Sequence, residues 1–221
     1  MEYMKFQKYK KIFIKDLTFN LIFGIIVYEV NKERINIMIY LMSDTHFCQK
    51  SIIPYCKRPF SSIDEMNEKI IENWNSVVTN KDTVYFLGDF SFGTPNETRD
   101  ICNRLNGYKI IIRGNHDRDT DVEYFKEIGF SQVFDTPQRL YYTDQYSDMK
   151  YVILSHEPQY VNDNEFNIHG HIHDSSLSSE YPDMNQDNHL CVCVERINYT
   201  PILFDDIQED YLEDFFNRKE D

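Results

Sequence analysis

The chain has 221 residues and a formal net charge of −14. This length allows one large domain that buries about 70% of its unfolded surface, so the core needs no disulfide or structural metal to fold. An acidic surface without a basic stripe argues against nonspecific binding to duplex nucleic acid, although bound metal ions would reverse the local charge at a site. An odd number of cysteines in a chain that is not small favours reduced thiols and a cytoplasmic protein; they are Cys48, Cys56, Cys102, Cys191 and Cys193.

The first 37 residues differ in character from the rest of the chain. Lysines precede an apolar stretch, residues 17–28, which is far short of the roughly 20 residues that span a bilayer. No small-x-small cleavage site follows it. Three interpretations are open: an upstream extension with the native start at Met38, a packed helix or hairpin, or a signal or anchor. We expect residues 38–221 to form the functional domain and residues 1–37 to be an N-terminal extension.

Strand and helix patterns alternate in the first half of the chain. Apolar runs predict strands at 37–42, 83–87 and 109–113. A helix is expected to begin after Ser62, which forms a capping-box pattern with Glu65. Two further helices are expected at 95–105, with Pro95 in its first turn, and at 122–128, where Gly129 ends the helix. This alternation predicts a largely parallel βαβ half.

Short strand patterns dominate after Ser131, and few helical patterns separate them. The runs are 133–135, 139–143, 151–154, 166–168, 189–194 and 201–204. An acidic helix at 206–216 is expected near the end of the chain. These patterns predict two sheets packed face to face and flanked by helices.

Five short motifs each follow one of the apolar runs. They are Asp44-Thr45-His46, Gly88-Asp89, Gly114-Asn115-His116-Asp117, Ser155-His156 and Gly170-His171-Ile172-His173. Because side chains at the carboxyl ends of neighbouring strands converge on one crevice, the motifs direct four imidazoles, two carboxylates and one amide oxygen to one place. Oxygen and nitrogen donors without thiolate suit Mn, Fe, Zn, Co or Ni. Two such ions suit the hydrolysis of a phosphate ester.

The spacing within the motifs has a physical interpretation. Residues i and i+2 of a strand point to the same side, so Asp44 and His46 can hold one ion together, and His171 and His173 share a face. We expect Gly88 and Gly114 to lie where a strand turns sharply into the crevice. A single D-x-H or H-x-H pattern is commonplace, whereas an ordered set of five at strand ends is not expected by chance.

The order of the five motifs resembles that of the calcineurin-like metallophosphoesterases, from about Met38 to His173. The resemblance implies an α/β fold, a four-layer αββα sandwich of two mixed sheets flanked by helices, that holds two divalent metal ions. It assigns the first ion to Asp44, His46, Asp89 and His173. It assigns the second ion, with Asp89 as the bridge, to Asn115, His156 and His171. His116 would be the acid or the stabiliser of the transition state, and Asp117 would orient its neighbours.

The second motif departs from that of the serine/threonine protein phosphatases in the same superfamily. It reads Gly88-Asp89-Phe90-Ser91-Phe92-Gly93 and lacks the additional aspartate and the phosphate-binding arginine. The chain is therefore more similar to the small bacterial and phage members, many of which act on phosphodiesters. Arginines elsewhere are candidate phosphate contacts, although a solvated surface arginine is the simpler interpretation of each; they are Arg58, Arg113 and Arg118.

We expect a phosphodiesterase in which metal-bound hydroxide attacks in line with the leaving oxygen, with manganese as the favoured metal. The substrate would be a phosphate ester, such as a nucleotide or single-stranded nucleic acid, bound between rims at 49–61 and 175–188. Three alternatives are open: a phosphomonoesterase acting on nucleotides or small metabolites, a non-catalytic metal-binding scaffold, and an amidohydrolase. The amidohydrolase ranks last because its histidine pair lies on the first strand, whereas here the pair comes late. Nothing in the sequence predicts a membrane partner.

Overall fold

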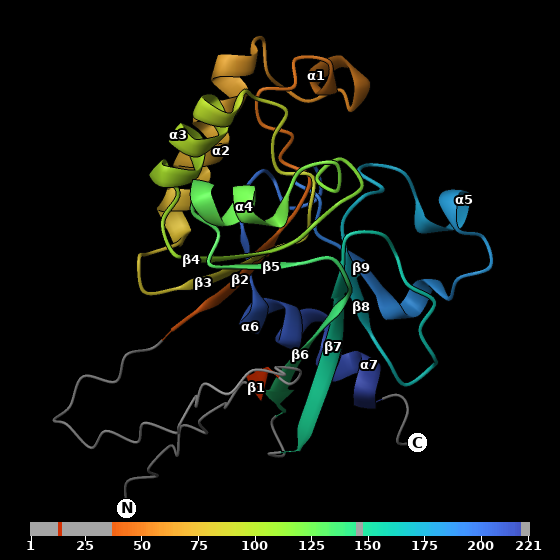
Figure 1. The fold of residues 1–221 in the computed structure, drawn as a ribbon. Helices are drawn as coiled ribbons and strands as arrows, with labels where there is room; N and C mark the ends of the chain where they lie inside the picture. The colour runs from red at the N-terminus through yellow and green to blue at the C-terminus, as the bar shows by residue number, and fades with distance from the viewer. Residues whose placement is uncertain (1–12, 15–36, 145–147, 218–221) are drawn as a thin grey trace, which may run out of the picture.

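The computed structural model describes residues 13–14, 37–144 and 148–217, and two five-stranded sheets form its centre (Figure 1). The interpretations of residues 1–37 concern a segment that lies almost wholly outside the described residues. Its described part is Phe13–Ile14 (β1), whose backbone pairs antiparallel with residues 140–141, together with residue 37.

The first sheet has the strand order β10-β2-β3-β4-β5. Four of its strands are parallel: β2 (Ile39–Met42), β3 (Thr83–Phe86), β4 (Tyr108–Ile112) and β5 (Gln132–Phe134). The alternating sequence pattern predicts the first three, whereas the run at 133–135, which forms β5, is expected in the mostly β second half of the chain. The edge strand β10 (Ile202–Leu203) runs antiparallel to β2.

The second sheet has the strand order β1-β6-β7-β8-β9. Its antiparallel part joins β1, β6 (Gln138–Thr143) and β7 (Met149–Ser155), and its parallel part joins β7, β8 (Asn167–His169) and β9 (His189–Cys191). Both sheets are therefore mixed, and flanking helices pack against them. The predicted α/β sandwich of two mixed sheets with flanking helices is confirmed.

Three helices lie over one face of the first sheet (Figure 1): α2 (Ile63–Val77), α3 (Pro95–Arg104) and α4 (Val122–Ile128). The Ser62 side chain accepts the Glu65 N–H at 3.1 Å, as predicted, but the Glu65 carboxylate bonds Ser61 rather than Ser62. Helix α4 ends at Ile128, and Gly129 directly after it has a φ of 118°, which is available to glycine at little cost.

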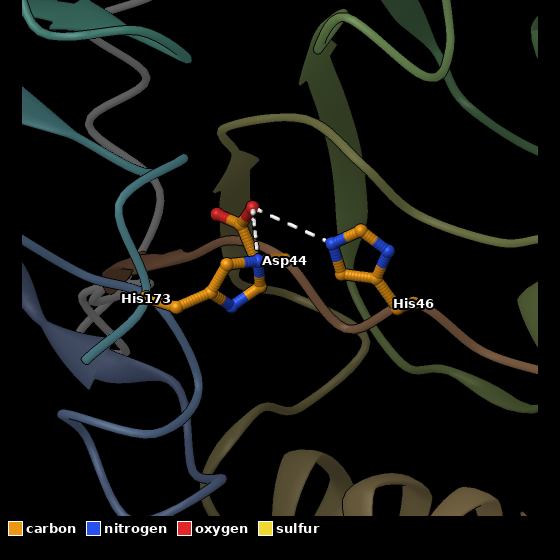
Figure 2. A group of neighbouring side chains, drawn as sticks. All are labelled: Asp44, His46 and His173. Carbon is orange, nitrogen blue, oxygen red and sulfur yellow. Dashed lines mark ion pairs between the residues drawn. The ribbon is translucent and has the colours of Figure 1, made fainter. Parts of the chain in front are cut away.

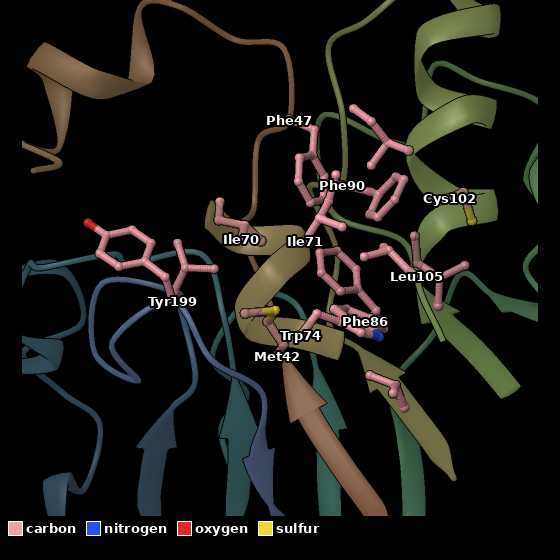
Figure 3. Packing of buried hydrophobic residues seen from close by; sticks show 14 of the residues in the cluster. Met42, Phe47, Ile70, Ile71, Trp74, Phe86, Phe90, Cys102, Leu105 and Tyr199 are labelled. Carbon is pink, nitrogen blue, oxygen red and sulfur yellow. The ribbon is translucent and has the colours of Figure 1, made fainter. Parts of the chain in front are cut away.

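Strand alternation divides the core in two. Met42 and Phe86 face the helices and pack in one cluster with Trp74 of α2 (Figure 3), whose indole N–H donates to the Asn106 carbonyl at 3.0 Å. Leu41 of β2, on the opposite face, packs in a second cluster between the two sheets. The side chains of the first sheet are thus buried on both of its faces, against the helices on one side and against the second sheet on the other.

The C-terminal helix begins earlier than predicted and is not uniform. It runs from α6 (Phe204–Ile207) through a π-helical stretch (Gln208–Leu212) into α7 (Glu213–Asn217). Its apolar side chains join the cluster between the sheets. The sequence patterns missed two single-turn helices, α1 (Ile52–Tyr55) and α5 (Leu177–Glu180), and a 3₁₀ turn at Gln186–Asn188. Among the described residues, none of the helices has the length and apolar character of a membrane span.

Candidate metal centre

The carboxyl ends of strands from both sheets meet at one place. Asp44, Asp89 and Asn115 follow β2, β3 and β4 of the first sheet, while the histidines His156, His171 and His173 follow β7 and β8 of the second. A parallel bridge between Ser43 and Cys193 joins the two sheets there. The Ser43 N–H donates to Val192 at 3.0 Å, and the Val194 N–H donates to Ser43 at 3.1 Å. This junction lets two sheets contribute to one cluster.

Asp44, His46 and His173 form the first cluster of possible ligands (Figure 2). Oδ1 of Asp44 lies 3.6 Å from Nε2 of His46 and 3.7 Å from Nε2 of His173. These separations are too long for hydrogen bonds. They suit ligands of one ion, since bonds of about 2.1 Å in tetrahedral geometry place two ligand atoms about 3.4 Å apart.

Asn115, His156 and His171 form a second cluster. Oδ1 of Asn115 lies 2.9 Å from Nε2 of His156 and 3.0 Å from Nδ1 of His171, and these two nitrogens are 3.2 Å apart. Asp89 lies between the clusters: its Oδ2 is 3.5 Å from Nε2 of His156 and 3.6 Å from Nε2 of His46. All seven residues expected from the motifs therefore come together.

Unpaired buried atoms test whether a cation fits this arrangement. Within the described part of the chain, Oδ1 of Asp44 and both ring nitrogens of His46 are buried without a hydrogen-bond partner. Buried polar atoms are nearly always paired, because an unpaired one loses its bonds to water. A cation would satisfy Asp44 Oδ1 and His46 Nε2 together, so the residues fit a metal ion.

The carboxylates create a negative field within the cluster. Burial raises the pKa of Asp89, and the charges of Asp44 and Asp117 add to this effect and bring it to about 7. Burial also raises the pKa of Asp44, but the neighbouring imidazoles outweigh it and hold this pKa well below its usual range; they are His156, His46 and His173.

The histidines respond to the same field. Burial lowers the pKa of His173, but contacts with Cys56 and Glu195 and the charge of Asp44 outweigh it and raise the pKa to about 11. Burial lowers the pKa of His46 and of His171, which favours the neutral imidazole that binds metal ions. Without a metal, the negative charge around His173 thus favours its protonated form. A bound cation would supply that positive charge in place of the proton.

Most of these residues adopt a left-handed backbone. The φ angles are 59° at Asp44, 49° at His46, 58° at Asp89, 71° at His171 and 46° at His173. Each such residue costs about 1–3 kcal/mol, and this strain is typical of functional sites.

These angles correct one part of the sequence argument. Strand β2 ends at Met42 and β8 ends at His169, so neither pair of ligands lies in a strand. Left-handed turns, and not the alternation of a strand, bring Asp44 next to His46.

Glycines allow the loops to approach one another. Gly88 has a φ of 91°, as a sharp turn requires, and a Cβ there would lie 2.5 Å from the Gly114 nitrogen. Gly114 itself has no positive φ, so the expected sharp turn does not explain it. A Cβ at Gly114 would instead overlap Oδ1 of Asp89, and a Cβ at Gly170 would overlap Oδ2 of Asp44. Close packing of the loops is what requires glycine at these two positions.

Neighbouring groups fix the orientation of individual side chains. Nδ1 of His156 lies 2.7 Å from the Leu87 carbonyl, which leaves Nε2 facing Asn115. Oδ2 of Asp44 accepts three hydrogen bonds and so leaves Oδ1 toward the imidazoles; the donors are the Ser43 hydroxyl, the His171 N–H at 2.9 Å and the Cys193 thiol at 3.2 Å.

The two residues expected to be catalytic differ in their placement. The side chain of His116 is 49% exposed, and its Nε2 lies 4.0 Å from Oδ2 of Asp89. Its ring packs beside Phe92, which also stacks on His46. Asp117 is buried and accepts backbone N–H groups of Asp89 at 2.6 Å and Gly114 at 2.9 Å. His116 can therefore reach a substrate, whereas Asp117 supports the loop that carries Asp89.

The candidate phosphate-binding arginines occupy three different environments. Arg58 is fully buried and bonds Glu195 and backbone carbonyls, so it presents no N–H to a substrate. Arg113 is also buried, against Asp135. The surface interpretation was therefore wrong for both. Arg118 lies at the surface, where it forms a two-point ion pair with Glu157 at 2.8 and 3.1 Å.

Sequence reasoning missed Glu195, the residue that bonds His173. Its Oε1 lies 3.1 Å from Nδ1 of His173, and its side chain is 3% exposed. It follows β9 in a stretch without a metal-binding motif, so no pattern in one sequence marks it. Sequence reasoning also missed Ser43, whose hydroxyl donates to Oδ2 of Asp44. Its position directly before Asp44 could have indicated this contact.

A cavity of about 640 Å³ opens over both clusters. His46, Asp89 and His116 line its base, and two segments form its walls: 49–57 and 172–175, with Glu180. The predicted rims at 49–61 and 175–188 overlap these walls. Another cavity, of about 700 Å³, lies beside the edge strands β9 and β10, and none of the seven motif ligands lines it.

Comparisons with known proteins agree with this geometry. The family model described as calcineurin-like phosphoesterase matches residues 37–219. An uncharacterized protein of Methanocaldococcus jannaschii is 40% identical over 173 residues, which cover 76% of this chain and 87% of that protein. The crystal structure of a protein of unknown function from Aquifex aeolicus is similar with a TM-score of 0.60 and 26% identity, covering 79% of this chain and 99% of that one.

The family match spans every strand of the two sheets except β1 and includes all five motifs, and the archaeal relative covers 76% of this chain. The family accounts for metal-ligand clusters at the junction of the two sheets and implies a metal-dependent hydrolase of phosphate esters. On these grounds the chain belongs to the calcineurin-like phosphoesterase family.

Proposed function

We propose that this protein is a dinuclear phosphodiesterase whose catalytic domain is residues 38–221. Asp44, His46 and His173 would hold one ion, and Asn115, His156 and His171 the other. Asp89 would bridge them. The position of Asp89 carries the proposal, because one carboxylate oxygen lies 3.6 Å from His46 of the first cluster and 3.5 Å from His156 of the second.

Two divalent ions at these clusters would activate water and polarise the phosphoryl oxygens. Three side chains of the protein would have further roles in the reaction. His116, whose ring is exposed, would donate a proton to the leaving oxygen or stabilise the charge that develops there. Asn115 adds a neutral oxygen donor, which limits the negative charge beside an anionic substrate. Asp117 keeps the Asp89 loop in place.

The charge of the cavity favours a diester over a monoester. Among the described residues that line it, Lys57 is the one lysine or arginine, and Asp89, Asp174 and Glu180 are acidic. A diester carries one negative charge, whereas a monoester carries up to two and would need further cationic contacts. We propose nucleotides or single-stranded nucleic acid as substrates, manganese as the metal and the cytoplasm as the location, the last supported by five free cysteines.

Asp89→Asn tests the proposal. The purified variant should lose bound manganese and nearly all hydrolysis of bis-p-nitrophenyl phosphate, because both clusters lose their shared anionic ligand. Asp100→Asn, at an exposed position on α3, is the matched control and should behave as the wild type. Full activity in Asp89→Asn would refute the two-ion site. Faster wild-type hydrolysis of p-nitrophenyl phosphate than of the diester would favour the monoesterase alternative.

A further inference from the structure

A buried ion pair lies directly behind the first cluster. The Arg58 guanidinium contacts Oε1 of Glu195 through Nε at 2.8 Å and through a terminal nitrogen at 2.7 Å. The Arg58 side chain is 0% exposed and that of Glu195 is 3% exposed. A buried pair of this kind adds little net stability, because desolvation of the charges offsets their attraction. Its position therefore calls for an explanation other than stability.

Arg58 holds the backbone that carries two of the ligands. Its terminal nitrogens donate to the carbonyls of Asp44 and Thr45, each at 2.7 Å. This is the segment in which Asp44 and His46 adopt left-handed φ angles. A left-handed backbone at a residue other than glycine persists only where the surroundings enforce it. The fork of the guanidinium supplies two such constraints on consecutive carbonyls.

Glu195 holds the third ligand. Its contact of 3.1 Å with Nδ1 of His173 fixes the ring so that Nε2 faces Oδ1 of Asp44. A carboxylate on the far nitrogen of a metal-binding histidine fixes its tautomer and raises its basicity. Oε1 of Glu195 also contacts Arg58. Although Cys56 also lies nearby, this oxygen is committed to Arg58 and His173 and is poorly placed to bind another ion.

The second cluster is supported by other groups. Nδ1 of His156 faces the Leu87 carbonyl at 2.7 Å. In the described part of the chain, the side-chain hydrogen bonds of Arg58 and Glu195 join the two residues to each other and reach Asp44, Thr45, Met66 and His173, and none reaches Asn115, His156 or His171. Arg58 and Glu195 therefore act directly on the first cluster, and their link to the second runs through Asp44, which accepts the His171 N–H at 2.9 Å.

We propose that Arg58 and Glu195 are positioning residues that set the affinity of one of the two ions, the one held by Asp44, His46 and His173. This inference rests on the proposed two-ion function. Loss of the pair should leave the ion at Asn115, His156 and His171 in place. The fork of Arg58 is required as well as its charge, since a lysine cannot bond two carbonyls and a carboxylate in one plane.

Calorimetric titration of EDTA-treated protein with MnCl₂ tests the proposal. The wild type should bind two ions. Glu195→Gln retains an oxygen acceptor and nearly the same volume, and Arg58→Lys retains the charge. Both should weaken one site by about 10–100-fold and leave the other within twofold. Asp135→Asn, which breaks the pair with Arg113, is the matched control and should titrate as the wild type.

A double-mutant cycle identifies the affected ion. His46→Ala removes a ligand of the first cluster, so adding Glu195→Gln should not change the affinity of the remaining ion. Equal weakening of both sites, unchanged affinity at both, or loss of folded protein in both single variants would overturn the proposal. Fewer than two ions in the wild type would instead refute the proposed function.

Discussion

Oδ2 of Asp117 lies 2.6 Å from the backbone nitrogen of Asp89, 28 residues earlier in the chain. The same oxygen accepts the Gly114 N–H, and Oδ1 accepts the Phe90 N–H. One carboxylate thus joins the loop after β3 to the loop after β4. Since Asp89 is the residue between the two clusters, the spacing of the clusters depends on this junction.

Asp117→Asn should disrupt this junction. An asparagine has one acceptor oxygen where three N–H donors converge, so at least one donor is left unpaired, at a cost of about 1–3 kcal/mol. We expect a lower unfolding midpoint in urea and reduced manganese content. Asp121→Asn is the control, because Asp121 caps α4 and asparagine caps a helix equally well. Wild-type manganese content in Asp117→Asn would assign Asp117 a different role.

The sequence alone predicts the parallel strands β2, β3 and β4 and the ligands that follow them for a simple reason. Each motif directly follows an apolar run, and the carboxyl ends of parallel strands meet at one edge. The predicted end of β2 is enough to locate Asp44, and the predicted end of β3 is enough to locate Asp89. These placements depend on local order in the chain, which a single sequence displays.

The rest of the site depends on contacts between distant segments. Glu195 is 22 residues from His173, and Arg58 is 137 residues from Glu195, with no motif to connect them. The left-handed φ angles of Asp44 and His46 likewise depend on tertiary contacts. The expectation that residues i and i+2 of a strand point to the same side therefore predicted correctly that Asp44 and His46 are neighbours, but for an incorrect reason. Buried arginines such as Arg58 resemble surface arginines in sequence because their partners are not adjacent.

His116→Ala should slow the reaction without releasing metal. The His116 ring is exposed, and its nearest carboxylate atom is 4.0 Å away, so the cluster does not need it. General acid catalysis contributes about 10²–10⁴-fold, and the loss should be largest for poor leaving groups. Rates on diesters with leaving groups of graded pKa measure this, with metal content as the control. Loss of manganese would make His116 a ligand.

Gly170→Ala should displace Asp44 and weaken metal binding. The added methyl would overlap both Oδ2 of Asp44 and Oγ of Ser43, and these atoms bond each other. Overpacking of this kind costs about 1–3 kcal/mol. Gly93→Ala is the control, because its methyl would come no closer than 3.0 Å to its neighbours, which are the Cys48 sulfur and the Cβ atoms of Cys48 and Glu97. Thermal unfolding and manganese titration of both variants check the prediction. Equal effects of the two substitutions would contradict it.

Tyr55→Ala tests for a substrate with a nucleobase. Tyr55 lines the cavity and is 80% exposed, so its ring is available to stack on a base. Stacking contributes about 1–3 kcal/mol per base, which predicts a rise in KM of roughly 5- to 150-fold for thymidine 5′-(p-nitrophenyl phosphate). Methyl p-nitrophenyl phosphate has the same leaving group without a base, and its KM should not change.

Tyr160→Ala is the matched control for this substitution. Tyr160 is 74% exposed but does not line the cavity over the clusters. Its removal should change neither KM. If Tyr55→Ala raised the KM of both diesters equally, the tyrosine would shape the cavity without binding a base.

Manganese should stabilise the folded protein strongly. Asp44 and Asp89 are buried with unfavourable mutual charge, and a cation would relieve it while pairing Oδ1 of Asp44. Ligand at 100 times its Kd stabilises the native state by about 2.7 kcal/mol. For a chain of this size, that corresponds to a rise of roughly 5–10 °C in Tm. Calorimetry with EDTA and with MnCl₂ measures the shift. Asp89→Asn should lose most of it, and an equal shift in that variant would place the stabilising ion outside the two clusters.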